Sequence, residues 1–429
     1  MSSIFLIRLK RYIRNIIRIV IVVFALIIVL LLAVIAFAKF SENHGTADLS
    51  GGHVPKEIRR LHVNGYINAV AWNADGSRLA TEGYFGSVIT LFDTANWRLL
   101  KEFNRLGGAY SSNSLAFLHD NTLLTATPNG DYSEDPYYAN TPLVDSRYNR
   151  LDIFSLIDWN PETGKVVKYF PDVSDPPKDT KPHLITTDTF TVSKDGSLVA
   201  GSMLGDFVLI YDSSSGALIK ELHIPRIPMS AWSQDVLASA RKHRSPTEGP
   251  LPTSMEDGVF SEAFSPDGRE LAVGTGNGFV HFYDTHTWEI THSVTIFPDQ
   301  LYTCNALAYS PDGALLAVGK EKNFNLENPN DIAVHIVKVS DGTLVAALPG
   351  SLEKVLGKEE ASGVTSLSWS PKDDVLAVGD GVSLRIWRIT PSDQTLLLKV
   401  KIRQGAFSTA FSPQGLLAAT DNDEVVIYQ

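Results

Sequence analysis

Hydrophobic and polar positions divide this chain into two unlike parts. Residues 19–38 read IVIVVFALIIVLLLAVIAFA and contain no charged or strongly polar side chain. A helix of about 20 apolar residues spans the roughly 30 Å hydrocarbon core of a bilayer. From residue 57 onward, short runs alternate between apolar and polar residues, with many β-branched and aromatic side chains, which is typical of β-strands. The sequence therefore predicts one transmembrane helix followed by an all-β domain.

Charges around the apolar run predict its orientation. Residues 1–18 carry five basic side chains and no acidic one, whereas only Lys39 directly follows the run. Basic residues favour the cytoplasmic side, so we expect a single-pass protein with a cytoplasmic N-terminus and an extracytoplasmic domain, periplasmic if the protein is bacterial. The alternative is a signal peptide cleaved after Ala38, although signal-peptide cores usually have about 7–15 apolar residues. Both interpretations export the large domain.

A polar segment separates these two parts of the chain. Residues 39–56 are rich in Ser, Gly, Asn and His and have no apolar periodicity, which predicts a flexible linker. The predicted organisation is a basic cytoplasmic or interfacial segment over residues 1–18, a transmembrane helix over 19–38, the linker over 39–56 and the β domain over 57–429.

The β domain repeats a short turn that joins two strands. It reads FSPDG at residues 264–268 and YSPDG at 309–313, and related turns begin at Trp72, Phe117, Val192, Trp369 and Phe411. Proline presets φ for a type I turn, aspartate caps the turn through its side chain, and glycine takes the left-handed position. Each copy therefore predicts a tight hairpin between the first and second strands of a repeat.

A third strand follows each hairpin. Four of these strands end in an acid, usually after an aromatic residue, as in VITLFD (88–93), FVLIYD (207–212) and FVHFYD (279–284). The same set includes LDIFSLID, which ends at Asp158, and the strands IAVHIVKV, VSLRIWRI and EVVIYQ. A polar turn and a fourth strand complete the unit. Four-stranded units repeated around an axis are the blades of a β-propeller.

With these motifs, the sequence resembles the WD-repeat-like β-propeller family over about residues 56–429. The aromatic-Ser-Pro-Asp-Gly turn and the aromatic-Asp strand end fit the family, whereas its Gly-His dipeptide is missing and Phe-Asp or Tyr-Asp replaces Trp-Asp. The resemblance implies a propeller and brings no catalytic residues with it.

Seven third strands predict seven blades. The chain ends directly after the last third strand, and residues 57–63 precede the first inner strand without a blade of their own. We therefore expect this N-terminal strand to complete the last blade and close the ring without a long free edge. Residues 229–240 resemble an additional inner hairpin, which we interpret as an insertion, and an eight-bladed ring is the alternative.

Insertions are predicted to gather on one face of the disc. The number of residues from the start of the turn motif to the end of the third strand is far larger in residues 117–158 and 309–340 than in 192–212. Other extra residues lie between one blade and the next, at 171–185, 224–258 and 349–362. Because strands alternate in direction, all these connections leave from one face, and the tight turns lie on the other. We call these the loop-rich face and the short-turn face.

Loops on a rigid scaffold commonly carry binding function, so we expect a protein partner at the loop-rich face. The candidate residues are the tyrosines and arginines of the longest insertion, together with a basic cluster: Tyr132, Tyr137, Tyr138, Arg147, Tyr148, Arg150, Arg241, His243 and Arg244. Tyrosine and arginine dominate interface hot spots. The competing interpretations are that the tyrosines pack over a neighbouring blade and that the basic cluster is a solvated loop.

Charge and cysteine content exclude several classes of function. The formal net charge is −11, and without the five basic side chains of residues 1–18 the chain has 32 basic against 48 acidic residues, a net of −16. Such a domain repels phosphate backbones, which argues against nucleic-acid binding. Cys304, the sole cysteine, excludes an internal disulfide framework and a cysteine-based zinc site.

The motifs that could bind a ligand predict neither a cofactor nor a metal site. Residues 421–424 and 323–331 offer oxygen ligands without the spacing of a calcium loop, and residues 274–278 (GTGNG) join two strands rather than opening a helix. His281 and His335 fall within third strands, where packing or solvent exposure is expected rather than ligation, and Cys304 fits a buried, inert thiol. We therefore expect a non-catalytic interaction scaffold that contacts the bilayer through residues 19–38. The alternative is an exported propeller hydrolase, or a metal- or quinone-dependent dehydrogenase, with its site at the central channel.

Overall fold

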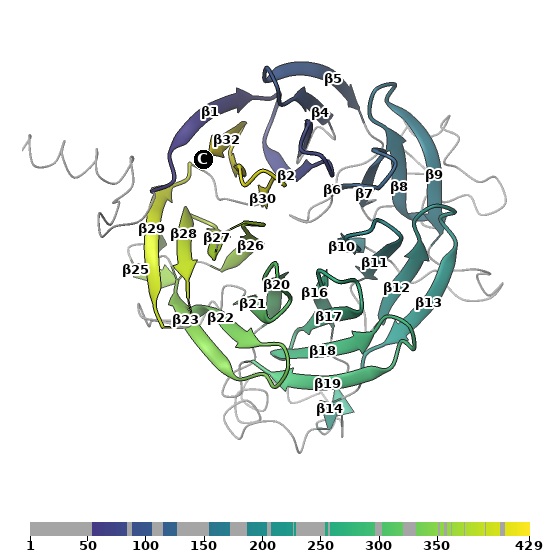
Figure 1. Cartoon of the computed structure of the whole chain (residues 1–429), viewed down its shortest axis with the longest axis vertical. Coiled ribbons are helices and arrows are strands. Elements are labelled where there is room, and N and C mark those ends of the chain that lie inside the picture. Colours follow the sequence, from purple (N-terminus) through teal and green to yellow (C-terminus); the bar gives the residue numbers. More distant parts are fainter. Residues whose placement is uncertain are drawn as a thin grey trace, which may run out of the picture.

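The computed structural model describes residues 54–83, 88–104, 115–126, 154–171, 187–203, 207–225, 227–228, 254–255, 258–296, 303–320, 332–350, 352–355, 358–361, 363–372, 374–390, 392–403 and 408–429. These residues form seven four-stranded antiparallel sheets, which are arranged as blades around an axis (Figure 1). The prediction of an all-β, seven-bladed β-propeller is thus confirmed. The described part of the chain contains no eighth four-stranded sheet, and residues 229–240 lie outside it.

The first four blades each run from the innermost to the outermost strand in sequence order. They are blade 1, β2 (Ile67–Trp72), β3 (Arg78–Gly83), β4 (Val88–Asp93) and β5 (Arg98–Asn104); blade 2, β6 (Leu115–Phe117), β7 (Leu123–Ala126), β8 (Phe154–Asn160) and β9 (Lys165–Pro171); blade 3, β10 (Thr187–Val192), β11 (Leu198–Met203), β12 (Phe207–Asp212) and β13 (Leu218–His223); and blade 4, β16 (Val259–Phe264), β17 (Glu270–Thr275), β18 (Phe279–Asp284) and β19 (Ile290–Thr295).

Blades 5 and 6 repeat this order, whereas blade 7 takes strands from both ends of the chain. They are blade 5, β20 (Cys304–Tyr309), β21 (Leu315–Lys320), β22 (Ile332–Lys338) and β23 (Leu344–Pro349); blade 6, β26 (Val364–Trp369), β27 (Val375–Asp380), β28 (Ser383–Ile389) and β29 (Gln394–Lys401); and blade 7, β30 (Thr409–Phe411), β31 (Leu417–Asp421), β32 (Glu424–Tyr428) and β1 (Glu57–His62).

In blade 7, β1 lies beside β32, as Figure 1 shows at the top left of the ring. The two strands are antiparallel, with Glu57 opposite Tyr428 and His62 opposite Glu424. Lys56 and Gln429 extend the pairing through two backbone hydrogen bonds of 2.8 and 2.9 Å. The first described residues and the C-terminal residue therefore lie together on the short-turn face.

The core lies between the flat faces of neighbouring blades. Val334 of blade 5 packs in one cluster with Leu376 of blade 6, and Ile427 of blade 7 packs in another with Leu79 of blade 1. Burial of apolar surface of this kind contributes roughly 25 cal/mol per Å². Close approach of the blades requires glycine at Gly319, because a Cβ there would lie 2.5 Å from Val364 Cγ1.

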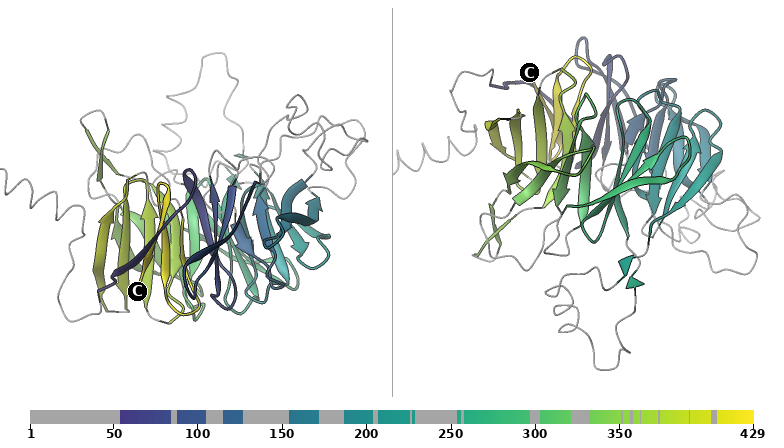
Figure 2. Two further views of the ribbon diagram at one scale, coloured as in Figure 1. Left: turned by 90° about the horizontal axis from the view of Figure 1, so that it is seen from above. Right: turned by 60° about the horizontal axis from the view of Figure 1, so that its bottom comes forward.

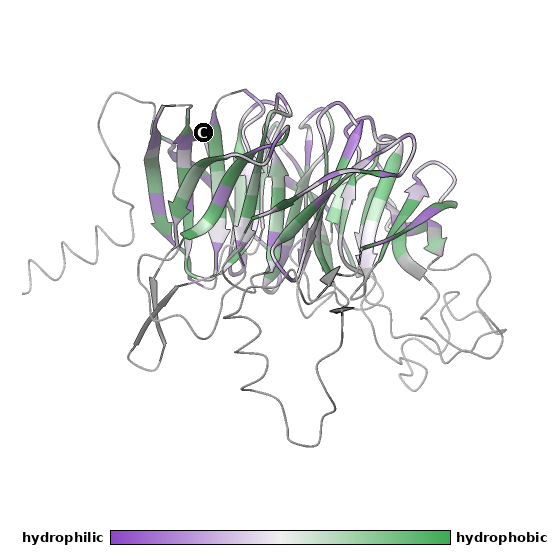
Figure 3. Cartoon of the chain, turned by 90° about the horizontal axis from the view of Figure 1, so that it is seen from below, coloured by the Kyte–Doolittle hydropathy of each residue, from purple (hydrophilic) through white to green (hydrophobic). Residues whose placement is uncertain are grey.

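The two faces of the disc differ as the sequence predicts. Within the described residues, tight turns join the first to the second strand and the third to the fourth strand, all on one side (Figure 2). On that side the turns are mostly hydrophilic, whereas the strands are largely hydrophobic (Figure 3). Two small hairpins, β14–β15 (Ile227–Pro228 and Ser254–Met255) and β24–β25 (Leu352–Val355 and Lys358–Ala361), project from the opposite, loop-rich side (Figure 2).

The strand ends bordering the predicted insertions also lie on the loop-rich side. The second strand of blade 2 ends at Ala126 and its third strand begins at Phe154; the corresponding strands of blade 5 end at Lys320 and begin at Ile332. The strands themselves follow the sequence prediction closely, except that β8 continues past Asp158 to Asn160. There Trp159 pairs with Leu123 and Val166 in the two neighbouring strands.

No helix in the described part of the chain is long and apolar enough to cross a membrane. Residues 19–38 lie outside that part, so the transmembrane helix stays a prediction.

Candidate interaction surfaces

The acids of the Ser-x-Asp turns on the short-turn face are structural. Ser265 Oγ donates a 2.7 Å hydrogen bond to Asp267, and Ser310 Oγ donates one of 2.6 Å to Asp312. Each carboxylate also accepts the backbone N–H two residues later. The serine hydroxyl is the main cause that lowers the pKa of each aspartate, followed by the backbone N–H. These ionised carboxylates hold the turns closed and are poor proton donors.

The acid that ends the third strand has a similar role. Asp212 accepts hydrogen bonds from the backbone N–H and hydroxyl of Ser215 and from the hydroxyl of Ser214. The Ser215 hydroxyl is the main cause that lowers the pKa of Asp212 to about 2. Asp284 accepts from two backbone N–H groups in the same way. The aromatic-Asp motif therefore marks a turn, not a catalytic site.

The aromatic residue before each short turn packs against the preceding blade. Trp72 Nε1 donates a 3.0 Å hydrogen bond to Ala410 O, and Trp369 Nε1 donates one of 3.1 Å to Ala308 O. In both cases the acceptor is the carbonyl next to the equivalent aromatic position of the preceding blade. The indoles thus cover the junctions between blades 7 and 1 and between blades 5 and 6.

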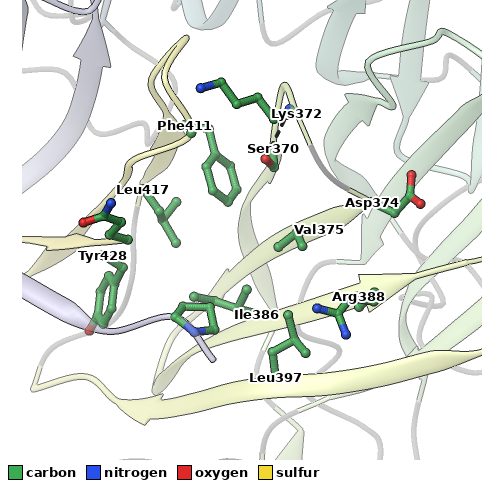
Figure 4. A pocket seen from close by; sticks show the side chains of 13 residues that line it. Ser370, Lys372, Asp374, Val375, Ile386, Arg388, Leu397, Phe411, Leu417 and Tyr428 are labelled. Atoms are coloured by element: carbon green, nitrogen blue, oxygen red, sulfur yellow. Dashed lines mark hydrogen bonds between the residues drawn. The ribbon is translucent and has the colours of Figure 1, made fainter. Parts of the chain in front are cut away.

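Phe411 stands at the same position in blade 7 and carries no hydrogen-bond donor on its ring. A groove with a volume of about 580 Å³ lies beside it, between blades 6 and 7 on the short-turn face (Figure 4). Its apolar side chains include Ile386, Leu397 and Leu417, and Pro55 and Gln429 lie at its outer end. Lys372 and Arg388 add two positive charges to the same walls.

On the loop-rich side, the acids of residues 421–424 form a hairpin turn paired with arginines. Arg60 Nη1 lies 3.1 Å from Asp421 Oδ2 and 2.9 Å from Glu424 Oε2. Arg403 of blade 6 contacts the same two carboxylates, and its backbone N–H donates to Asp421 at 2.8 Å. The oxygen atoms that resemble calcium ligands in sequence therefore bind β1 and blade 6 to blade 7.

A second ion pair of the loop-rich side is fully buried in blade 6. Arg385 Nη2 lies 3.1 Å from Asp380 Oδ2, and both side chains are almost inaccessible to solvent. Asp380 also accepts the backbone N–H groups of Val382 and Ser383, while Arg385 donates to the carbonyl of Pro349 in blade 5. This pair connects the two blades next to the β24–β25 hairpin.

Two buried titratable groups lie in blade 4. Glu262, on the innermost strand, accepts a 2.8 Å hydrogen bond from Thr189 Oγ1 of blade 3, and burial raises its pKa to about 8. His281 lies 2.7 Å from Ser293 Oγ, and burial lowers its pKa to about 4. Both groups are therefore mostly neutral at pH 7. His281 is packed within its third strand, as expected from the sequence.

Other sequence predictions for individual residues concern Cys304, the turn at residues 274–278 and His335. Cys304 is fully buried, as predicted, and residues 274–278 join β17 to β18 in a turn. His335 lies 3.1 Å from the carbonyl of Ile296 in the neighbouring blade. Among the residues that the structure describes, no group of three or more His, Cys, Asp or Glu side chains is arranged to hold a metal ion.

The predicted partner-binding residues lie outside the described residues. This applies to the whole set of Tyr132, Tyr137, Tyr138, Arg147, Tyr148, Arg150, Arg241, His243 and Arg244. Sequence reasoning did not identify the groove residues Lys372, Arg388 and Phe411. Phe411 gives no distinctive sequence signal, because Phe117 and Phe264 stand at the same repeat position in blades 2 and 4.

The fold defines a seven-bladed β-propeller, and similarity to WD-repeat proteins supports the family resemblance. No family model matches the chain. Minichromosome loss protein 1 of Schizosaccharomyces pombe is 33% identical over 111 residues, which are 25% of this chain and 12% of that protein. Human Echinoderm microtubule-associated protein-like 1 is 31% identical over 129 residues, or 30% of this chain and 14% of that protein.

A third relative, WD repeat-containing protein SL1-17 of Schistosoma mansoni, is 25% identical over 177 residues, covering 38% of this chain and 54% of its own length. Each match thus spans only part of the relative. Among solved structures, a chain of the Mitotic Checkpoint Complex superimposes with a TM-score of 0.58 at 16% identity, covering 90% of this chain and 94% of the other. The β-propeller domain of Cps50 (Swd1) from Myceliophteria thermophila gives 0.55 at 14% identity, covering 87% and 99%. These similarities establish the fold.

Proposed function

We propose that the protein is a membrane-anchored, extracytoplasmic β-propeller that acts as a non-catalytic scaffold and binds another protein through its loop-rich face. The observation that carries this proposal is the asymmetry of the disc. In the described residues, both projecting hairpins and the strand ends that border the predicted insertions lie on one face, whereas the opposite face consists of tight turns closed by their own hydrogen bonds. Loops presented by a rigid scaffold are the usual place for recognition.

The position of the first described residues supports an orientation for this scaffold. Val54 and Lys56 precede β1 on the short-turn side, so a chain arriving from a helix at residues 19–38 approaches that side. The loop-rich face then points away from the bilayer. The basic side chains of residues 1–18 favour the cytoplasm, which leaves the acidic domain outside.

The same proposal assigns β1 the role of a clasp that closes the ring. Its backbone pairs with β32, and Arg60 ties it to Asp421 and Glu424. Leu61 adds apolar contact with blade 1. A force applied through the linker would act on β1 first, so this strand also transmits force between the membrane and the propeller.

The names of similar proteins are consistent with a role in assemblies. One relative is named for its likeness to a microtubule-associated protein, and one structural neighbour is part of the Mitotic Checkpoint Complex. Both descriptions concern association with other proteins, which supports a scaffold more than an enzyme.

Affinity capture of the full chain, solubilised in detergent and coupled to mass spectrometry, tests the proposal. Replacing residues 129–150 with a short Gly-Ser linker should remove at least one captured protein, because the longest predicted insertion is lost. The melting temperature of the variant should stay close to that of the parent, since the described strands of all seven blades are retained. A folded deletion variant that retains every captured protein would reject this assignment of the binding face.

Membrane topology is tested by labelling introduced cysteines with a membrane-impermeant maleimide. Cys304 is fully buried and should give little background. Ser50→Cys, in the linker, should react in intact cells or spheroplasts, whereas Ser3→Cys should react only after permeabilisation. The reverse labelling pattern would place the propeller in the cytoplasm and contradict the proposal.

A further inference from the structure

The groove between blades 6 and 7 lies on the short-turn face, opposite the face proposed above to bind a partner. Its volume of about 580 Å³ falls within the roughly 300–1,000 Å³ typical of ligand sites. Figure 4 shows Phe411 and Leu417 on the blade 7 side and Ile386 and Leu397 on the blade 6 side. These side chains give the groove an apolar lining.

No indole covers this junction, as is also the case at the junctions where Phe117 and Phe264 stand at the equivalent position. Trp72 and Trp369 reach across their junctions to the carbonyls of Ala410 and Ala308. In the junction between blades 6 and 7, the equivalent carbonyl belongs to Ser368, and the ring of Phe411 has no hydrogen-bond donor for it. An apolar side chain from another molecule can therefore occupy the space that the indoles fill elsewhere.

The walls of the groove are held in place by main-chain hydrogen bonds. Gln429 and Lys56 exchange two backbone bonds at the outer end. At the inner end, Ser412 Oγ accepts the backbone N–H of Leu416 at 3.1 Å, and Gly415 adopts a φ of +88° in the turn. A site whose walls are already ordered loses little conformational freedom when a ligand binds.

The charges beside the groove favour an anionic ligand. Lys372 and Arg388 line it, and neither forms a hydrogen bond or ion pair through its charged end within the described residues. Asp374 is the single acidic side chain in the lining. With two positive and one negative side chain, the lining has a net charge of +1, whereas the chain as a whole is acidic. A ligand with a carboxylate next to an apolar side chain therefore fits both the cations and the apolar lining of the groove.

We propose that this groove binds a peptide segment of a partner protein in which apolar side chains lie next to carboxylates. The apolar side chains occupy the space between Phe411 and Leu397, and the carboxylates pair with Lys372 and Arg388. Such pairs at a partly exposed rim set specificity and orientation, while the buried apolar contact supplies most of the affinity. The groove is thus a second docking surface, independent of the loop-rich face.

Fluorescence anisotropy with the full chain in detergent measures the binding directly. The labelled probe is the peptide GSDLLDSG, and the matched peptides GSKLLKSG and GSDSSDSG remove the negative charge and the apolar anchor respectively. The first peptide should bind saturably, and each matched peptide should bind at least about tenfold more weakly, equivalent to about 1.4 kcal/mol. Absence of saturable binding by GSDLLDSG, or equal binding of all three peptides, would overturn the proposal.

Two variants locate the site. Phe411→Trp places an indole in the groove, as at Trp72 and Trp369, and should weaken binding of GSDLLDSG at least about tenfold. The double variant Lys372→Glu/Arg388→Glu should have the same effect, and its changes lie at solvent-accessible positions that leave the core intact. Lys194→Glu/Arg269→Glu reverses two charges beside a different pocket of the same face and serves as the control, with binding unchanged.

Three further results decide whether the groove binds a partner peptide. Unchanged binding by a folded Lys372→Glu/Arg388→Glu variant overturns the assignment even if Phe411→Trp fails to fold. The linker contains an acid beside an apolar residue at positions 48–49, so it is the competing occupant. If deletion of residues 40–52 raises the affinity for GSDLLDSG about tenfold, the groove belongs to the linker and not to a partner. Replacement of residues 129–150 should leave peptide binding unchanged, which separates this site from the loop-rich face.

Discussion

Glu262→Gln should make the protein more stable at alkaline pH. Glu262 lies on the innermost strand of blade 4, where it accepts a hydrogen bond from Thr189, whose hydroxyl lies 2.9 Å from that of Ser202. Its other carboxyl oxygen is buried without a hydrogen-bond partner in the described part of the chain. Glutamine has the same shape and can accept the bond from Thr189 without carrying a charge into this apolar position.

The magnitude follows from the pKa of Glu262, which burial raises from 4.5 to about 8. Because the folded state keeps the proton and the unfolded state releases it, the contribution of Glu262 is complete below about pH 4.5. It decreases as pH rises through the folded pKa, by about 1.4 kcal/mol per pH unit. The total loss between these two values is on the order of 4–5 kcal/mol, and glutamine does not suffer it.

Urea denaturation followed by tryptophan fluorescence measures this effect on the full chain in detergent. The difference in free energy of unfolding between Glu262→Gln and the parent should rise by several kcal/mol from pH 5 to pH 8. Other titrating groups cancel in this difference because both proteins contain them. Glu289→Gln, at an exposed position of the same blade, is the matched control for the substitution itself. A pH-independent difference for Glu262→Gln would refute the argument that burial holds the proton.

Three further substitutions test the packing between blades. Gly319→Ala should destabilise the fold by about 1–3 kcal/mol in thermal denaturation, since the added Cβ would overlap the next blade. Gly83→Ala is the control and should change stability little, because its added Cβ would lie 3.5 Å from the nearest atom. Arg385→Met should cost about 3–5 kcal/mol in urea denaturation by leaving the buried Asp380 unpaired, and an unchanged midpoint would contradict the role of this pair. His281→Gln should reduce the loss of stability on acidification from about pH 6.5 to 4. Between these pH values the folded state keeps His281 neutral, whereas the unfolded state binds a proton. Equal acid sensitivity of both proteins would argue against this.

The strands and turns could be predicted from the sequence because their signals are local. The predicted third strands at residues 88–93, 207–212 and 279–284 match β4, β12 and β18 in full. Alternation sets the face of each side chain, and the Ser-Pro-Asp-Gly chemistry sets each turn. Blade 2 departs from the pattern at Trp159, where the aromatic residue follows the acid and hydrogen-bonds to Thr125, so the strand runs further than its motif indicates.

The contacts between blades could not be predicted, because they join residues far apart in sequence. Nothing local at Asp421 shows that its partner is Arg60. Glu262 resembles a solvated acid on an alternating strand until blade 3 is placed against it. The groove beside Phe411 likewise depends on how two blades meet.

Site-specific photo-cross-linking in cells tests the central claim most directly, because it reports which face touches a partner. Benzoylphenylalanine is introduced at Tyr138 or Tyr148 in the longest predicted insertion, and at His286 in an exposed turn of the short-turn face away from the groove. We expect a discrete cross-linked protein from Tyr138 or Tyr148 and none from His286. Adducts that form from His286 alone would contradict binding through the loop-rich face.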